Sequence, residues 1–381
     1  MKIAYVTTYN SSDLHAWSGL GSHILRALQD VGFQTEIIGN LRRRKIRLQL
    51  SRFKKAYYLL LSKKYLSDRE PGKVEKRLVS VHSDLVFSPG TIPIAYLKTE
   101  KPIVFYTDAT FAGMIDFYPG FSNLCPETIK NGNKMEQLAL SKCRLAIYAS
   151  EWAANTAIQN YDVDPAKVKV VPFGANINCN RNINEIGRII DNKSFDTCKL
   201  LFLGVDWYRK GGEKALAVAN LLNKRGLRTE LHVAGCNPPF SPSPFVKNHG
   251  FITKTTEEGR KHLEQLLSEA HFLILPSRAE CYGVVFAEAS SFGLPSLATK
   301  VGGIPTAIQD GKNGWTFHID ETPEKYCDYI ERFMLSKDDY RGLALSCFEE
   351  YSERLNWYSA GRKIYDLMQT FCGYRDRGAH R

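Results

Sequence analysis

The sequence predicts an α/β protein with two doubly wound parallel sheets. Short apolar segments alternate with segments of helical period along the chain, and this series occurs twice. The run HFLILP at residues 271–276 is continuously apolar, as expected of a parallel strand that is buried on both faces. A chain of 381 residues with 44% hydrophobic content can also bury two cores. We therefore expect two domains, each with its own sheet.

The expected strands fall into two groups. The first group comprises residues 2–7, 36–38, 85–88, 103–106, 145–149 and 168–171, with a helix over residues 22–28 after the first strand. The second group comprises residues 199–203, 230–234, 271–275 and 295–298. A polar stretch rich in Asn, from Asn176 to Asp196, is the expected linker between the two domains.

The most informative segment is SRAECYGVVFAEASSFGLPSLATKVGGIP, directly after the strand at 271–275. Glu280 lies in its first loop, and Glu288 lies eight positions later in a helix expected to continue to Phe292. Carboxylates accept hydrogen bonds from sugar or ribose hydroxyls, and amides at the start of a helix can bind an anion. The amides concerned are those of Tyr282, Gly283, Val284 and Val285. The alternative is an ordinary solvated helix with two surface glutamates.

A second segment, LLFLGVDWYRKGGEKALAVANLLNKRG, has the pattern strand, loop, helix. Its loop contains Arg209 and Lys210 directly before the glycine pair Gly211 and Gly212. Two cations beside a helix start can neutralise phosphate charge. The alternative is a solvated pair of charges.

These segments resemble the donor-binding motifs of the retaining GT-B glycosyltransferases of family 4, which use sugar nucleotides. Their usual form is P-S-x-x-E-G-F-G-x-x-x-x-E-A-x-A-x-G-x-P, followed by a G-G-I-P stretch. The matching residues are Pro276, Ser277, Glu280, Gly283, Glu288, Ala289, Gly293, Pro295 and residues 302–305. Cys281 replaces the usual glycine. In the upstream motif, G-R-x-x-x-x-K-G, Lys210 matches the lysine but Val205 occupies the arginine position, so Arg209 is the candidate for that role.

The resemblance implies two Rossmann-like domains that face a cleft. Residues 1–180 would form the acceptor-side domain, residues 196–355 the nucleotide-sugar domain, and residues 356–381 a helix that crosses back to the first domain. The implied reaction transfers a hexosyl unit from a nucleotide-diphosphate sugar to a hydroxyl of a glycan, lipid or small molecule, with retention and without a metal or other cofactor. The implied catalytic residues are Glu280, Lys210, Arg209 and Asp108.

By resemblance Glu288 binds the ribose, and the backbone near Ile252 and Gly235 lines the base pocket. Gly19 and Asp108 each have two possible roles. Gly19, in the turn at residues 18–21, either approaches the donor phosphate or simply opens a helix. Asp108, in FYTDATF, either orients a sugar hydroxyl or caps the next turn. The alternative functions are a phosphorylase that uses free phosphate and a protein that binds a nucleotide-sugar without turning it over.

The basic excess of +11 is concentrated in one segment, Arg42 to Lys64, which holds ten basic and no acidic residues. Ile46, Leu50, Phe53, Tyr57 and Leu60 form one apolar stripe on the helix expected there. Such a helix either lies on an anionic membrane or packs its stripe on the domain. Binding of nucleic acid is not expected, because no motif of that class is present.

The remaining signals predict a cytoplasmic protein, at most peripheral at the inner face of the membrane. The nine cysteines are scattered without a metal-binding spacing, which indicates free thiols. The N-terminus enters a strand without a signal-peptide pattern, and no apolar run is long enough to span a bilayer. The Asp162 and Asp164 pair precedes Pro165 and is typical of a turn, so we expect no metal site.

Overall fold

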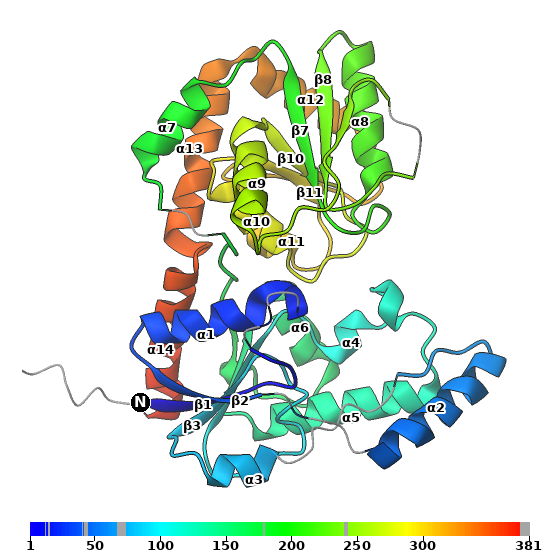
Figure 1. The fold of residues 1–381 in the computed structure, drawn as a ribbon, viewed down its shortest axis with the longest axis vertical. Helices are drawn as coiled ribbons and strands as arrows, with labels where there is room; N and C mark the ends of the chain where they lie inside the picture. The colour runs from blue at the N-terminus through cyan, green and yellow to red at the C-terminus, as the bar shows by residue number, and fades with distance from the viewer. Residues whose placement is uncertain are drawn as a thin grey trace, which may run out of the picture. The chain divides into compact units, whose positions relative to one another are not determined.

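The computed structural model describes residues 1–11, 13, 16–39, 41, 45–66, 74–177, 180–239 and 243–373. The chain forms two compact units, Met1–Pro172 with Ala360–Arg381, and Phe173–Ser359. Each unit has a six-stranded sheet in which all paired strands are parallel, with helices between most successive strands (Figure 1). The predicted α/β class is therefore confirmed.

The sheet of the first unit has the order β2-β1-β3-β4-β5-β6. Its strands are β1 (Lys2–Val6), β2 (Gln34–Ile38), β3 (Leu85–Ser88), β4 (Ile103–Thr107), β5 (Leu145–Tyr148) and β6 (Val168–Val170). Its helices are α1 (Leu20–Asp30), α2 (Lys45–Leu60), α3 (Val74–Val79), α4 (Phe111–Met114), α5 (Pro126–Lys142) and α6 (Glu151–Asn160). β3, β4 and β5 are buried along their whole length, as central parallel strands are.

The last helix, α14 (Trp357–Cys372), belongs to the first unit from Ala360 onward (Figure 1). It lies close against α1, because a Cβ on Gly361 would stand 2.6 Å from the carbonyl oxygen of Ala27. Arg144 anchors its far end by donating from Nε to the carbonyl of Phe371 at 2.7 Å. Gly361 thus allows α14 to pack this closely on α1, because any side chain at this position would clash with the backbone of α1.

The sheet of the second unit has the order β12-β11-β10-β7-β8-β9. Its strands are β7 (Cys198–Leu203), β8 (Thr229–Ala234), β9 (Val246–Asn248), β10 (Phe272–Leu275), β11 (Ser296–Thr299) and β12 (Gly314–Phe317). Its helices are α7 (Ile183–Asp191), α8 (Gly212–Lys224), α9 (Glu257–Glu269), α10 (Val284–Ser290), α11 (Ile304–Ala307), α12 (Pro323–Leu335) and α13 (Lys337–Arg354).

The structure differs from the expected elements mainly at the sheet edges and at the domain boundary. β9 and β12 were not expected, because these short edge strands expose part of their length and lack a continuous apolar run. The units divide between Pro172 and Phe173, ahead of the expected linker. Much of that stretch forms α7, whose Asn182 and Glu185 make a reciprocal cap at its start. These two of the polar residues that suggested a linker are thus capping residues.

The strand orders place one switch point in each sheet. In the first unit, β1 lies between β2 and β3, and in the second unit β7 lies between β10 and β8. Ligands of open α/β sheets bind beyond the carboxyl ends of the strands at such points. Ligand sites are therefore expected at the loops after β1 and β3 and at those after β7 and β10. No helix in the described part of the chain has the length and hydropathy to cross a bilayer.

Candidate functional site

The loop after β7 is folded tightly against the loop after β10. Gly211 caps the start of α8 with φ +77°, and a Cβ there would stand 2.0 Å from the carbonyl oxygen of Pro276. Gly212 is packed on the ring of Trp207, which its Cβ would meet at 2.2 Å. These contacts explain why the sequence has a glycine pair here, and they bring the neighbouring Lys210 to the end of β10.

The loop after β10 is held by backbone hydrogen bonds to its neighbours. The amide of Arg278 donates to the carbonyl of Arg209 at 2.8 Å, and the amide of Gly303 donates to the carbonyl of Glu280 at 3.1 Å. Gly283 then adopts φ +86° and caps α10. The carboxylate of Glu280 is thereby fixed beside the β7 loop, at the switch point of the sheet.

Glu280 and two cations form a buried ion cluster. The Glu280 carboxylate accepts hydrogen bonds from Nζ of Lys210 and, at 3.3 Å, from Nη1 of Arg209. Arg209 also donates from Nη1 to the carbonyl of Ala279 at 3.0 Å, while Asp206 accepts from the Arg209 amide at 3.0 Å. Glu280 is 7% exposed and Lys210 8%. The predicted trio is therefore brought together in one unit.

The cluster sets the ionisation of its carboxyl group. Burial raises the pKa of Glu280, but the charges of Lys210 and Arg209 and their hydrogen bonds outweigh it, so the pKa is lowered. Glu280 is an anion at neutral pH, and both cations stay fixed on it. A preorganised pair of cations at a strand-to-helix crevice is suited to a phosphate group.

Glu288 lies in α10, one and a half turns beyond Gly283, and is also buried. Its Oε1 accepts a hydrogen bond from Nζ of Lys254, whose side chain is 41% exposed. The buried carboxylate of Glu288 thus accepts a hydrogen bond from a partly exposed lysine side chain, which a ligand can replace. The sequence did not indicate Lys254, because it precedes Glu288 by 34 positions in a loop without a motif.

The other predicted donor residues of this unit lie around the same strand ends. Tyr282 is buried and donates from its hydroxyl to the carbonyl of Phe173 at 2.9 Å, so only its backbone can serve a ligand. Val284 and Val285 form the first turn of α10. Gly235, with φ +99°, packs on Gly204 at the end of β7. Its amide donates to the carbonyl of Gly250, two residues before Ile252.

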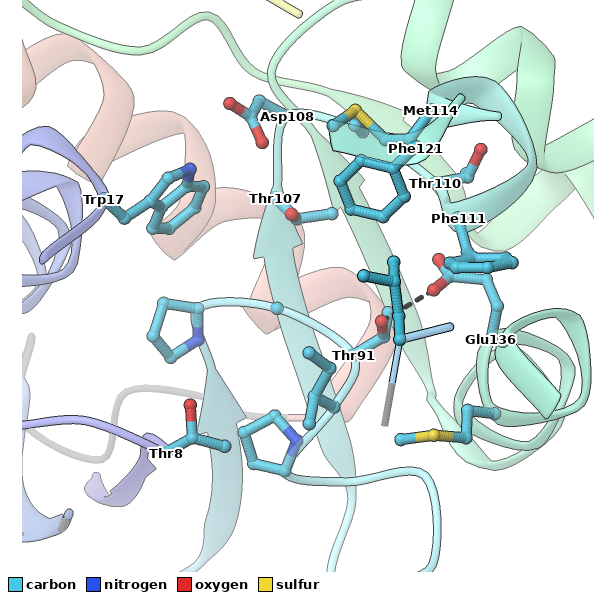
Figure 2. A pocket seen from close by; sticks show the side chains of 18 of the residues that line it. Thr8, Trp17, Thr91, Thr107, Asp108, Thr110, Phe111, Met114, Phe121 and Glu136 are labelled. Atoms are coloured by element: carbon cyan, nitrogen blue, oxygen red, sulfur yellow. Dashed lines mark hydrogen bonds between the residues drawn. The ribbon is translucent and has the colours of Figure 1, made fainter. Parts of the chain in front are cut away.

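Gly19 and Asp108 belong to the first unit. Gly19 has φ +77° and is the N-cap residue of α1, directly after Trp17 and Ser18, which also have positive φ. Asp108 follows β4 and lines a pocket (Figure 2). The N-cap residue of the following helix α4 is Thr110, whose side chain accepts the amide of Gly113 at 3.0 Å.

The same pocket contains a carboxyl group that the sequence did not indicate. Glu136 in α5 is buried and accepts a hydrogen bond from Oγ1 of Thr91 at 2.7 Å (Figure 2). The sequence does not indicate that Glu136 is buried, because the residue lies among polar residues of a helix and resembles a surface position. Of the Asp-x-Asp pair, Asp164 accepts the amide of Ala166, as expected of a turn. The described residues contain no cluster of His, Cys, Asp or Glu suited to a metal ion.

Comparisons with known proteins agree with this geometry. Residues 197–336, which include the ion cluster, match the family described as glycosyl transferases group 1. A D-inositol 3-phosphate glycosyltransferase of Corynebacterium diphtheriae is 27% identical over 247 residues, which cover 60% of this chain and 56% of that protein. The chain spans about half the length of the curated relatives that it matches.

Solved structures show the fold. Sucrose-phosphate synthase from Thermosynechococcus elongatus matches with a TM-score of 0.67 at 15% identity, over 98% of this chain and 100% of that one. Anabaena HepE in complex with UDP-glucose matches with a TM-score of 0.62 at 14% identity, over 97% and 100%. The predicted GT-B fold, with two Rossmann-like units, is thereby confirmed.

Proposed function

We propose that this chain, a member of the glycosyl transferases group 1 family through residues 197–336, transfers a hexosyl unit from a nucleotide-diphosphate sugar to an acceptor hydroxyl. The proposal includes retention at the anomeric carbon and no requirement for a metal. The observation that carries it is the buried Glu280 carboxylate held by both Lys210 and Arg209 at the switch point of the second sheet.

The cation pair accounts for departure of the nucleoside diphosphate. About one further negative charge develops on the already anionic diphosphate as its bond to the sugar breaks, and preorganised donors in a water-excluded site stabilise such charge by several kcal/mol. In the proposed complex, Lys210 and Arg209 donate to the diphosphate, while Glu280 keeps them in place and accepts a hydrogen bond from a sugar hydroxyl. The acceptor hydroxyl attacks from the face of the leaving group, and the departing phosphate accepts its proton.

Glu288 is assigned to the ribose. Its buried carboxylate already holds a hydrogen-bond donor, Nζ of Lys254. In the proposed complex the ribose hydroxyls replace this partly exposed ammonium group, which moves into solvent. The Anabaena HepE structure, which contains UDP-glucose, supports a sugar nucleotide as the class of donor.

A panel of sugar nucleotides that vary in base and sugar tests donor binding by thermal unfolding. A ligand at a hundred times its dissociation constant adds about 2.7 kcal/mol of stability, which corresponds to a rise in melting temperature of roughly 5–10 °C for a unit of this size. We expect Glu288→Gln to reduce the rise. Glu264→Gln, at the partly exposed Arg181 ion pair, is the matched control. If no member of the panel stabilises the protein, the proposed donor site is wrong.

Turnover separates this proposal from a protein that only binds nucleotide-sugars. We expect release of nucleoside diphosphate from the stabilising donor, unaffected by EDTA, and a product with the anomeric configuration of the donor. Stabilisation without any release, over a range of acceptors and with added Mg²⁺ or Mn²⁺, would instead support the non-catalytic alternative.

The basic helix is the second candidate interaction surface. In α2, Lys54 contacts Glu127 of α5, and Tyr58 stacks on Tyr65 with 5.8 Å between ring centroids. This packing leaves Phe53, Tyr57 and Leu60 exposed by 76%, 59% and 86%. Packing of the stripe on the domain therefore does not account for these three residues. Ile46, Leu50 and Arg42 to Arg44 lie outside the described side chains.

We propose that this exposed face binds anionic membrane surfaces. Each Lys or Arg near such a surface contributes about 1 kcal/mol, and the exposed apolar side chains enter the interface. The triple variant Phe53→Ser, Tyr57→Ser and Leu60→Ser is expected to lose sedimentation with phosphatidylglycerol vesicles. Val79→Ser, an equally exposed apolar residue in α3, is the control and should still sediment. Equal sedimentation of the triple variant and the wild type would exclude this contact.

A further inference from the structure

The pocket of the first unit has a volume of about 450 Å³, within the range of roughly 300–1,000 Å³ typical of small-molecule sites. It lies beyond the carboxyl ends of three adjacent strands, β1, β3 and β4, and therefore includes the switch point of the first sheet. The helices α4 and α5 close its other side.

Aromatic side chains form much of the wall. The ring of Phe111 lies directly on Gly132 of α5, where a Cβ would stand 2.2 Å from it, and packs edge-on against Phe121 at 6.0 Å between centroids. Trp17 stands opposite (Figure 2) and is the first of three successive residues with positive φ. For Trp17 and Ser18 this conformation is costly, so the surrounding structure enforces the position of the indole ring.

The charged groups of the pocket are all acidic among the described residues. Asp108 and Glu136 line it, and none of the described lining residues is Lys, Arg or His. Tyr9 also lines the pocket, and its phenol feels the charge of Asp108. Burial and this charge together raise the pKa of Tyr9 to about 12. A phosphate in this pocket would therefore face two carboxyl groups, and none of the described lining residues would bring a cation to it.

Among the backbone donors near the pocket, those at the start of α4 are engaged. At the start of α4, the amide of Gly113 donates to Thr110, and that of Ala112 donates to the hydroxyl of Tyr161 at 3.0 Å. The amide of Phe111 faces the carboxyl group of Glu136. No amide of this first turn is left to bind an anion.

Glu136 offers a polar group that a ligand can use. Its Oε2 accepts the hydroxyl of Thr91, but its buried Oε1 has no hydrogen-bond partner among the described residues. Burial raises the pKa of Glu136 to about 7, although the Thr91 hydroxyl and the Phe111 amide oppose this rise. The carboxyl group can therefore donate to a hydroxyl when protonated, or accept from a hydroxyl or an ammonium group when ionised.

We propose that this pocket binds the acceptor, that the acceptor carries hydroxyl or amino groups and an apolar face but no phosphate, and that Glu136 selects against anions. The inference rests on the proposed transferase function and specifies its acceptor. The proposed acceptor differs from that of the Corynebacterium relative, whose name gives D-inositol 3-phosphate, a phosphorylated molecule.

The methionine methyl groups report directly on the pocket. Met114 and Met135 line it, and the whole chain has five methionines. We would titrate methyl-labelled protein with phenyl β-D-glucoside, its 2-amino-2-deoxy analogue and its 6-phosphate. The first two are expected to shift the Met114 and Met135 signals to saturation, with the 6-phosphate at least about tenfold weaker. Equal or tighter binding of the 6-phosphate, or no shift with any probe, would overturn the proposal.

Glu136→Gln tests the assigned selectivity with nearly the same shape. We expect about tenfold weaker binding of the amino probe, through loss of a charge-assisted hydrogen bond, and a change below about threefold for the neutral glucoside. Glu127→Gln alters a carboxylate of the same helix that contacts Lys54 outside the pocket, and should change neither. Equal weakening of all probes by Glu136→Gln would indicate a purely structural residue and refute the selectivity.

The donor assay distinguishes this inference from the proposed function. Stabilisation by sugar nucleotides depends on the second unit and should persist in Glu136→Gln. If the wild type fails to respond to any donor while the methyl shifts follow the expected order, the proposed function fails and the ligand is not an acceptor, but the selectivity assigned to the pocket stands. If donors bind but the 6-phosphate is preferred, only the pocket assignment fails.

Discussion

Replacing Glu280 with Gln is expected to reduce donor turnover by about 100- to 1,000-fold, the loss typical of removing one preorganised electrostatic group. The substitution keeps the shape of the side chain but removes the charge that holds Lys210 and Arg209. Without the charge of Glu280 the two cations repel each other, while Arg209 keeps Asp206, whose carboxylate is 3.6 Å from its Nε. The pair then leaves the geometry needed by the diphosphate. The measurement is the rate of nucleoside diphosphate release at saturating donor.

The matched control for this substitution is Glu213→Gln. Glu213 lies in the first turn of α8, close in sequence to Lys210, but its carboxylate contacts Arg278 at the protein surface. We expect near-normal turnover there, because exposed ion pairs contribute little. Near-ultraviolet circular dichroism would establish that both variants are folded. Turnover of Glu280→Gln within about threefold of the wild type would contradict the assigned electrostatic role.

The sequence predicted the three residues of the ion cluster in the second unit, although it missed two edge strands of that unit. Glu280, Lys210 and Arg209 were predictable, because the glycines that shape their loops are themselves visible. Gly211 and Gly283 adopt positive φ where the chain turns from strand to helix. Local backbone requirements of this kind leave a mark in the sequence.

The residues that were not predicted depend on tertiary packing. Glu136 is buried because α5 meets the loop that carries Thr91, 45 positions earlier in the chain. Lys254 meets Glu288 because the loop after β9 lies beside α10. Neither pairing alters a local pattern, so periodicity and spacing contain no sign of it. The edge strands β9 and β12 were missed because they are only three and four residues long and each includes exposed positions, so neither forms a continuous apolar run.

Replacing Lys210 with Met is expected to lower the free energy of unfolding by about 3 kcal/mol at neutral pH, near the lower end of the 3–5 kcal/mol typical of a broken buried ion pair. Glu280 would lose the Lys210 ammonium group and keep the contact with Arg209, whose Nη1 is 3.3 Å away. Methionine preserves most of the apolar stem, so the loss arises from the weaker charge compensation of the buried carboxylate rather than from a cavity. Urea unfolding at pH 7 is the measurement.

The double variant Lys210→Met with Glu280→Gln isolates the ionic origin of this loss. Removing both charges should recover most of the stability that Lys210→Met loses, while turnover stays low.

The pH dependence of stability gives a second check on the ionic origin of the loss. The lowered pKa of Glu280 stabilises the wild type above the ordinary pKa of glutamate, about 4.3. This contribution is lost as the pH falls through the lowered value, so the deficit of Lys210→Met should shrink in acid. A deficit that is constant with pH, or a double variant no more stable than the single one, would show that Lys210 acts by packing alone.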